Sequence, residues 1–217
     1  MKWDLIVETL PYLLKGAVLT LEIVSVSILI GVSLGTLVGL GRISRNSWLS
    51  AACATYTEVL RGTPLLVQLW IVFFGLPQVL KFNLNEFVAG FLAFGINSSA
   101  YVSEIIRAGI QSIDRGQMEA ARSLGMPYGM AMRFVILPQA FKRVIPPLWN
   151  EFISLLKNSS LVATISVEEL LRRGQLIATR TFRPLEMYLA VSAIYLVMTL
   201  ALSRVALFLE RRLGVSD

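Results

Sequence analysis

Long apolar runs constrain this chain more than any other feature of its sequence. Residues 23–41 contain no charged side chain. A helix that crosses a bilayer needs about 20 mostly apolar residues, because backbone polar groups must be bonded internally where water is absent. Across the whole chain, 55% of residues are hydrophobic and only 16% are charged. The sequence therefore predicts an all-α integral membrane protein rather than a soluble domain.

Five segments are predicted to span the membrane, at about residues 16–41, 49–76, 86–108, 143–165 and 184–209. Residues 1–15 predict a separate N-terminal helix at the membrane interface, because apolar residues alternate with Asp4, Glu8 and Lys15. The same residues could contribute to a sixth span, but Glu8 and Pro11 interrupt their short apolar run.

The placement of Lys and Arg predicts the orientation of the spans. With the N-terminus outside, eleven of the twenty basic residues fall on the cytoplasmic side, seven fall outside and two fall within spans. We therefore expect an outside N-terminus and a cytoplasmic C-terminus, although Arg172 and Arg173 lie on the less basic side. The net charge of +6 does not indicate nucleic acid, because the basic residues lie at the ends of apolar runs and form no single patch.

Small residues recur along one face of the first span. Gly31, Gly35 and Gly39 are four residues apart, a spacing that lets another helix approach closely. The approaching helix could be another span of this chain or a helix of a second chain.

The second span is interrupted by Arg61, Gly62, Thr63 and Pro64. Pro64 has no backbone donor and disfavours helical geometry at the residue before it. Broken helices at membrane depth are tolerated where they line a cavity, and their freed backbone groups can hold ionic parts of a substrate.

The fourth span contains two ionisable residues, Glu151 and Lys157, and Lys157 is followed by Asn158, Ser159 and Ser160. Six residues separate the two charges, so they project from nearly opposite faces and need different partners. Arg61 or Lys157 could bind a carboxylate, and Glu58 or Glu151 could accept an ammonium group. A cation and an anion placed in this way could together bind a zwitterion. The alternative is a kinked helix whose polar groups satisfy one another.

The longest loop between spans, at about residues 109–142, contains a compact helix with a built-in stop. We expect Glu119 in its first turn, where a carboxylate complements the helix dipole. Gly125 can adopt the left-handed conformation that ends helices, and Pro127 prevents continuation. A cytoplasmic helix of this kind is typical of a membrane protein that binds another subunit outside the bilayer. We treat residues 1–217 as one transmembrane domain that includes this loop.

In combination, several motifs resemble those of the permease subunits of polar-amino-acid ABC importers, the histidine/glutamine/arginine group. They lie at residues 58–68, 101–110, 116–126, 137–140, 146–147, 150–153, 156–161 and 209–212. Within the "EAA" loop pattern, Val135 replaces the usual isoleucine.

This resemblance implies a type I ABC-importer permease, with five transmembrane helices, the N-terminal interfacial helix and a cytoplasmic coupling helix. The expected ATPase-coupling residues are Glu119, Ala120, Ala121, Arg122 and Gly125. The expected substrate-binding residues are Arg61, Gly62, Thr63, Pro64, Gln68, Glu151, Lys157, Asn158, Ser159 and Ser160.

The resemblance also implies partners. They are a second permease chain, identical or a close paralogue, two ATP-binding subunits and an extracytoplasmic amino-acid-binding protein, all in a bacterial inner membrane. This chain has no Gly-x-x-x-x-Gly-Lys-Ser/Thr motif, so ATP and magnesium are expected on the ATPase subunit and no cofactor in this chain. The chain is expected to be a non-catalytic translocation subunit. Acidic groups near the presumed cavity favour a cationic amino acid, although glutamine carriers share these motifs.

Two other function classes compete with this reading. A stand-alone secondary transporter or channel is disfavoured because no internal repeat is evident and a docking helix would be superfluous. An intramembrane enzyme is disfavoured because the chain has no histidine and only one cysteine, Cys53.

Overall fold

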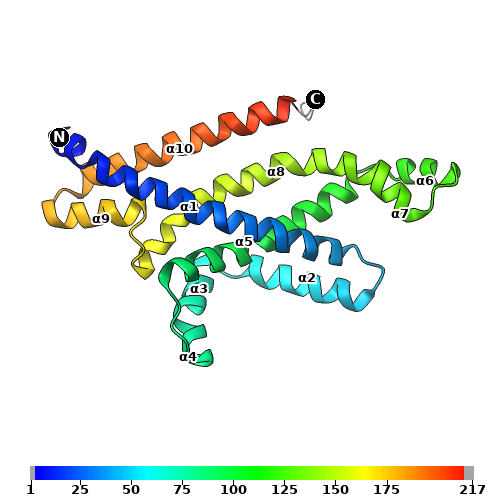
Figure 1. The fold of residues 1–217 in the computed structure, drawn as a ribbon, viewed down its shortest axis with the longest axis horizontal. Coiled ribbons are helices and arrows are strands. Elements are labelled where there is room, and N and C mark those ends of the chain that lie inside the picture. The colour runs from blue at the N-terminus through cyan, green and yellow to red at the C-terminus, as the bar shows by residue number, and fades with distance from the viewer. Residues whose placement is uncertain (1–2, 213–217) are drawn as a thin grey trace.

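The computed structural model describes residues 3–212, which form a helical bundle without β-strands (Figure 1). The α-helices are α1 (Trp3–Arg42), α2 (Ser47–Gly62), α3 (Leu65–Trp70), α4 (Leu76–Leu80), α5 (Glu86–Gln111), α6 (Arg115–Ser123), α7 (Tyr128–Ala131), α8 (Leu137–Asn158), α9 (Leu170–Thr181) and α10 (Pro184–Arg212). Two short π-helices, η1 (Ile71–Gly75) and η2 (Met132–Ile136), and one 3₁₀-helix, η3 (Ser159–Ile165), connect them.

The two ends of the bundle carry different elements. Helices α6 and α7 lie at one end, whereas α9 and the start of α1 lie at the opposite end (Figure 1). Helices α1, α5 and α8 run between these ends and form the middle of the bundle. The loop that contains Glu119 is therefore separated from α9 by the length of the bundle.

Helix α1 is continuous over 40 residues, so the prediction of a separate interfacial helix at residues 1–15 is wrong. Leu13 and Ala17 are buried in a cluster with residues of α9 and α10. Arg173 of α9 donates to the backbone carbonyl of Tyr12 at 3.1 Å, and its guanidinium lies 4.5 Å from the centre of the Tyr12 ring. Packing against α9 and α10 therefore holds the start of α1.

The glycine face of α1 packs against α5 of the same chain. A Cβ atom added at Gly35 would lie 2.6 Å from the carbonyl oxygen of Ser99, and Gly31 and Gly39 face Ser98 and Ser103 in the same way. Between the two alternatives for this face, the structure shows the intrachain contact. The absence of side chains on α1 is what brings the two backbones together.

The predicted five spans are recovered only in part. Helices α1 and α10 are long and apolar enough to cross a membrane. Helix α2 and the segment 65–80 pass the same test together, but the chain bends by 103° between them. The second predicted span is therefore broken at the predicted interruption, and the pair forms either one bent crossing or a re-entrant loop. Helices α5 and α8 are not among these candidates, and both carry charged side chains that line a cleft.

The fourth predicted span, residues 143–165, changes helix type before its end. Helix α8 stops at Asn158 and continues as the 3₁₀-helix η3. The hydroxyls of Ser159 and Ser160 donate to the carbonyls of Leu156 and Lys157, at 2.7 and 3.0 Å. These serines thus satisfy backbone groups at the helix end, where the regular bonding pattern stops.

We predict that Gly35→Ala destabilises the protein by about 1–3 kcal/mol, because the new methyl group cannot fit between α1 and α5. The measurement is the thermal denaturation midpoint of the detergent-solubilised chain. Gly129→Ala is the matched control, since a Cβ there meets nothing within 4 Å. Equal midpoints for both variants would contradict the close α1–α5 contact.

Candidate functional site

A cleft of about 480 Å³ opens between the end of α2 and the helices α5 and α8. Polar and charged side chains converge on it from all three helices: Arg61, Tyr101, Glu104, Ser112, Arg143 and Glu151. Two of them, Arg61 and Glu151, come from different predicted motifs. The fold therefore brings one cation and one anion of the predicted site into a common space.

Glu104 of α5 organises the cations at this cleft. Its carboxylate pairs with Arg42 of α1 and with Arg107 one turn further along α5. Arg61 lies at the limit of the same group, 4.0 Å from a Glu104 oxygen, and its guanidinium stands 5.4 Å from the centre of the Tyr101 ring. One carboxylate shared by three guanidinium groups leaves net positive charge on this side of the cleft.

The break after Arg61 is a built turn rather than a defect. Thr63 is extended, and Pro64 begins α3. Because Pro64 has no N–H, the carbonyl of Leu60 loses its helical partner. The side chain of Gln68 donates to that carbonyl at 2.8 Å, and Asn97 of α5 approaches the same oxygen at 3.4 Å. Side chains thus replace the missing backbone bond.

Gln68 uses its polar atoms within the protein. Its amide nitrogen also donates to the Thr63 hydroxyl at 2.8 Å, and its oxygen accepts from Asn97 at 3.0 Å. Both Gln68 and Asn97 are buried. Gln68, a predicted substrate contact, therefore uses its hydrogen bonds to hold the turn. Asn97 could not be identified from the sequence, because the residues around an asparagine in an apolar helix do not indicate which group its side chain will bond.

Glu151 lies on the α8 side of the cleft and is partly buried. Within residues 3–212 no lysine or arginine forms an ion pair with it. The Ser98 hydroxyl lies beside it and is fully buried. A carboxylate in this position can receive a cationic group that enters the cleft.

The second predicted motif lies elsewhere. Residues 157–160 do not line this cleft. Lys157 and Asn158 are exposed at the end of α8, whereas Ser159 is buried. Glu58 is exposed on α2 and also lies outside the cleft lining.

Helix α6 lies at the end of the bundle opposite α9 (Figure 1). Asp114 caps it by accepting from the backbone N–H of Gly116 at 2.7 Å. Glu119 occupies the fifth position of α6 and not the first turn, so that expectation is wrong; the capping carboxylate belongs to Asp114. Helix α6 begins at Arg115, four residues before Glu119.

The end of α6 follows the prediction. Gly125 has φ +83°, its N–H donates to Arg122, and the next N–H, of Met126, donates to Ala121. This pair of bonds is the Schellman arrangement, which requires a left-handed residue at its centre. Pro127 follows and begins α7.

Helix α6 has an inner and an outer face. Ala121 is buried, and α6 packs on η2, where Met118 joins a small apolar cluster around Ile136. Glu119, Ala120 and Arg122 are exposed, and Leu124 is 82% exposed. An apolar side chain this exposed, beside charged residues, is suited to a protein contact. Sequence reasoning did not single out Leu124.

The described residues show no cluster of three or more acidic or cysteine side chains that could hold a metal ion.

Comparison with known proteins identifies the family. The family described as "Binding-protein-dependent transport system inner membrane component" matches residues 5–215. The chain belongs to this family. It is a permease subunit, and it carries no catalytic activity of its own. The resemblance drawn from the sequence motifs is thereby confirmed.

Two curated relatives match nearly the whole chain. The arginine transport system permease protein ArtQ of Bacillus subtilis (strain 168) is 44% identical over 211 residues, which are 97% of this chain and 96% of ArtQ. The glutamine transport system permease protein GlnP of Escherichia coli (strain K12) is 39% identical over 215 residues, 98% of each chain.

Solved structures show the same fold. A chain of the structure titled "Crystal structure of an amino acid ABC transporter with histidines" is 47% identical, with a TM-score of 0.91 over 95% of this chain and 96% of that one. An inward-facing MetNI methionine ABC transporter matches with a TM-score of 0.81 at 18% identity, covering 97% of this chain and 99% of the other, which shows a shared fold alone.

We predict that Gln68→Leu lowers stability by about 1–3 kcal/mol, because it leaves buried polar groups at the turn without their partner. The thermal denaturation midpoint in detergent measures this loss. Gln78→Leu, at an exposed position on α4, serves as control. An unchanged midpoint combined with weaker substrate binding would instead restore Gln68 as a substrate contact.

Proposed function

We propose that this chain forms the translocation pathway for a polar amino acid in an ATP-driven importer. The observation that carries the proposal is the joint presence of Arg61 and Glu151 in one cleft. The substrates named for the relatives, arginine and glutamine, are both zwitterions at the backbone. A cleft with one cation and one anion is the complement of such a molecule.

The chemistry of entry supports this assignment. An amino acid that leaves water must replace the hydration of its carboxylate and its ammonium group, and an unreplaced charge costs several kcal/mol. Arg61 is held near Glu104 without a short ion pair, so its guanidinium is available to a carboxylate. Glu151 offers the opposite charge across the cleft. The two together would fix the orientation of the substrate.

A cationic amino acid such as arginine, lysine or histidine fits Glu151 best. The Glu151 carboxylate has no ion-pair partner in the described part of the chain, so a cationic substrate side chain would supply one. Glutamine, as in the GlnP relatives, would use the same carboxylate only for its α-ammonium group.

The proposed topology has five crossings, formed by α1, α2, α5, α8 and α10, with the N-terminus outside and α6 in the cytoplasm of a bacterial cell. The positive-inside rule supports it. Arg173, which argued against it, is engaged by protein groups: it donates to the carbonyl of Glu168 at 2.8 Å as well as to Tyr12.

The proposed assembly contains a second permease chain, two ATPase subunits and an extracytoplasmic binding protein. The exposed face of α6 would dock on an ATPase subunit. Because α6 packs on η2, and η2 leads directly into α8, a displacement of α6 would reach the helix that carries Glu151. Residues 157–160 do not line the cleft, so we propose that they contact the substrate only at a step of transport when it lies outside the cleft.

We predict that Gly125→Val uncouples ATP hydrolysis from transport, because a β-branched residue at positive φ costs at least ~1–2 kcal/mol and displaces the end of α6. Gly125→Asn is the matched variant, since asparagine tolerates this conformation. The measurement is amino acid transported per ATP hydrolysed in proteoliposomes. The role of α6 is refuted if both variants retain the wild-type ratio.

We predict that Glu151→Gln weakens binding of a cationic amino acid by about 2–5 kcal/mol, since it removes a buried charge partner with little change in volume. Uptake of labelled arginine, lysine, histidine and glutamine by the reconstituted importer measures the effect. The control is Glu58→Gln, outside the cleft.

Three outcomes are distinguishable. Selective loss of the cationic substrates supports side-chain recognition by Glu151, and equal loss for all supports recognition of the α-ammonium. No loss removes Glu151 from the pathway. Uptake without any ATPase subunit would favour the stand-alone transporter instead.

A further inference from the structure

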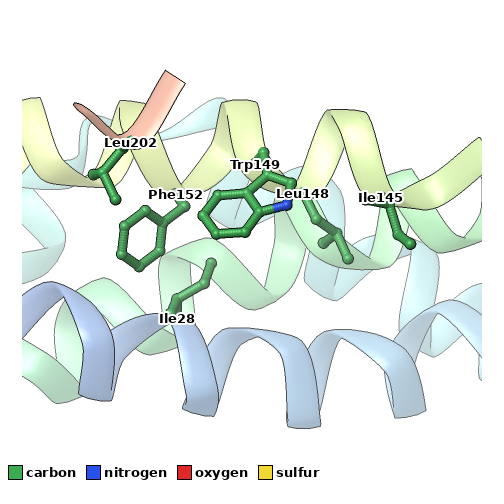
Figure 2. A pocket seen from close by; sticks show the side chains of 6 residues that line it. All are labelled: Ile28, Ile145, Leu148, Trp149, Phe152 and Leu202. Atoms are coloured by element: carbon green, nitrogen blue, oxygen red, sulfur yellow. The ribbon is translucent and has the colours of Figure 1, made fainter. Parts of the chain in front are cut away.

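An apolar groove runs along α1 and α8, on a different set of side chains from the polar cleft. Its first part, about 360 Å³, is lined by six apolar residues, with Ile28 on α1, Leu202 on α10 and the other four on α8 (Figure 2). Trp149 and Phe152 pack edge to face there, 5.8 Å between ring centres. Leu148 also lines the next cavity, of about 380 Å³, so the two cavities adjoin at this residue.

The groove follows one face of α1 toward the α6 end. Ile28, Val32, Thr36 and Leu40 line it in turn, and their spacing of four residues places them on one helix face. From Ile28 to Leu40 the helix rises roughly 18 Å at 1.5 Å per residue. This length is close to one leaflet of the ~30 Å hydrocarbon core. Thr36 is the one polar residue that lines the second cavity.

The α6 end of the groove is basic. Leu40 and Leu137 line both the second cavity and a third one of about 390 Å³, which also contains Arg45 and Tyr128. The Arg45 guanidinium lies 5.1 Å from the centre of the Tyr128 ring.

A neighbouring cavity of about 670 Å³ shares Tyr128 and adds Arg42 and Arg115. Arg42 is paired with Glu104, whereas neither Arg45 nor Arg115 forms an ion pair within residues 3–212. The one acid that lines this cavity, Asp114, is occupied as the cap of α6. The basic end therefore has positive charge left for an external anion.

We propose that this groove is a binding site for an anionic glycerophospholipid of the leaflet at the α6 end. Its phosphate would lie between Arg45 and Arg115, and one acyl chain would follow the α1 face toward Trp149. Charge complementarity selects an anionic headgroup, and basic pockets between membrane helices are suited to such lipids.

A helix of the second permease chain is the competing occupant. It fits less well, because an apolar helix would leave Arg45 and Arg115 without an anionic partner. The proposal is independent of which substrate enters the polar cleft.

The test is photo-crosslinking in the assembled importer. A benzophenone amino acid is introduced at Leu40, which is 43% exposed, and the complex is reconstituted in vesicles with equal amounts of phosphatidylglycerol and phosphatidylcholine. After irradiation, intact mass spectrometry of the permease chain identifies what has been attached. We expect the phosphatidylglycerol adduct to dominate.

Charge variants make the test specific. Arg45→Gln and Arg115→Gln should each lower the preference for phosphatidylglycerol roughly five-fold. Arg211→Gln, an exposed basic residue in the last turn of α10, should leave it unchanged. Equal labelling by the two lipids, or no response to the arginine variants, would overturn the proposal. So would a crosslink to the second permease chain as the main product.

Discussion

Helices α1 and α5 approach closely because glycine lines the α1 side of their contact and serine lines much of the α5 side. Hydrophobicity alone does not hold helices together in lipid, so close packing and polar contacts must do it. This contact sets the register of the two helices, and the register brings Arg42 at the end of α1 beside Glu104 on α5. The charged side of the cleft, including Arg61, is built on that pairing.

The polar cleft depends equally on the turn after α2. Pro64 frees a carbonyl that would be costly if left unpaired away from water. The Gln68 side chain donates a hydrogen bond to that carbonyl, and Asn97 of α5 donates one to Gln68, so that α5 holds the turn in place. Helix α5 therefore contacts the end of α2 at two points, through Asn97 at the Leu60 carbonyl and through Glu104 near Arg61. Helix α8 supplies Glu151 from the facing side and joins the cleft to η2 and α6.

Local signals in the sequence were sufficient for features that depend on neighbouring residues. The break at Pro64, the stop at Gly125 and the close-packing face of α1 all follow from backbone chemistry. Features set by distant contacts could not be predicted. The start of α1 reads as interfacial because the contact between Tyr12 and Arg173 joins residues 161 positions apart. The change from α-helix to 3₁₀-helix after Asn158 could not be predicted either, because no proline or glycine occurs in η3. The hydrogen bonds of Gln68 could not be predicted either, because one of its partners, Asn97, lies 29 positions further along the chain.

We propose that the substrate binds between Arg61 and Glu151. A cryo-electron microscopy structure of the assembled importer with saturating arginine would locate it. We expect density for the amino acid in the cleft between α2, α5 and α8, with its carboxylate toward Arg61 and its side chain toward Glu151. Density beside residues 157–160, with the cleft empty, would show that the substrate binds elsewhere.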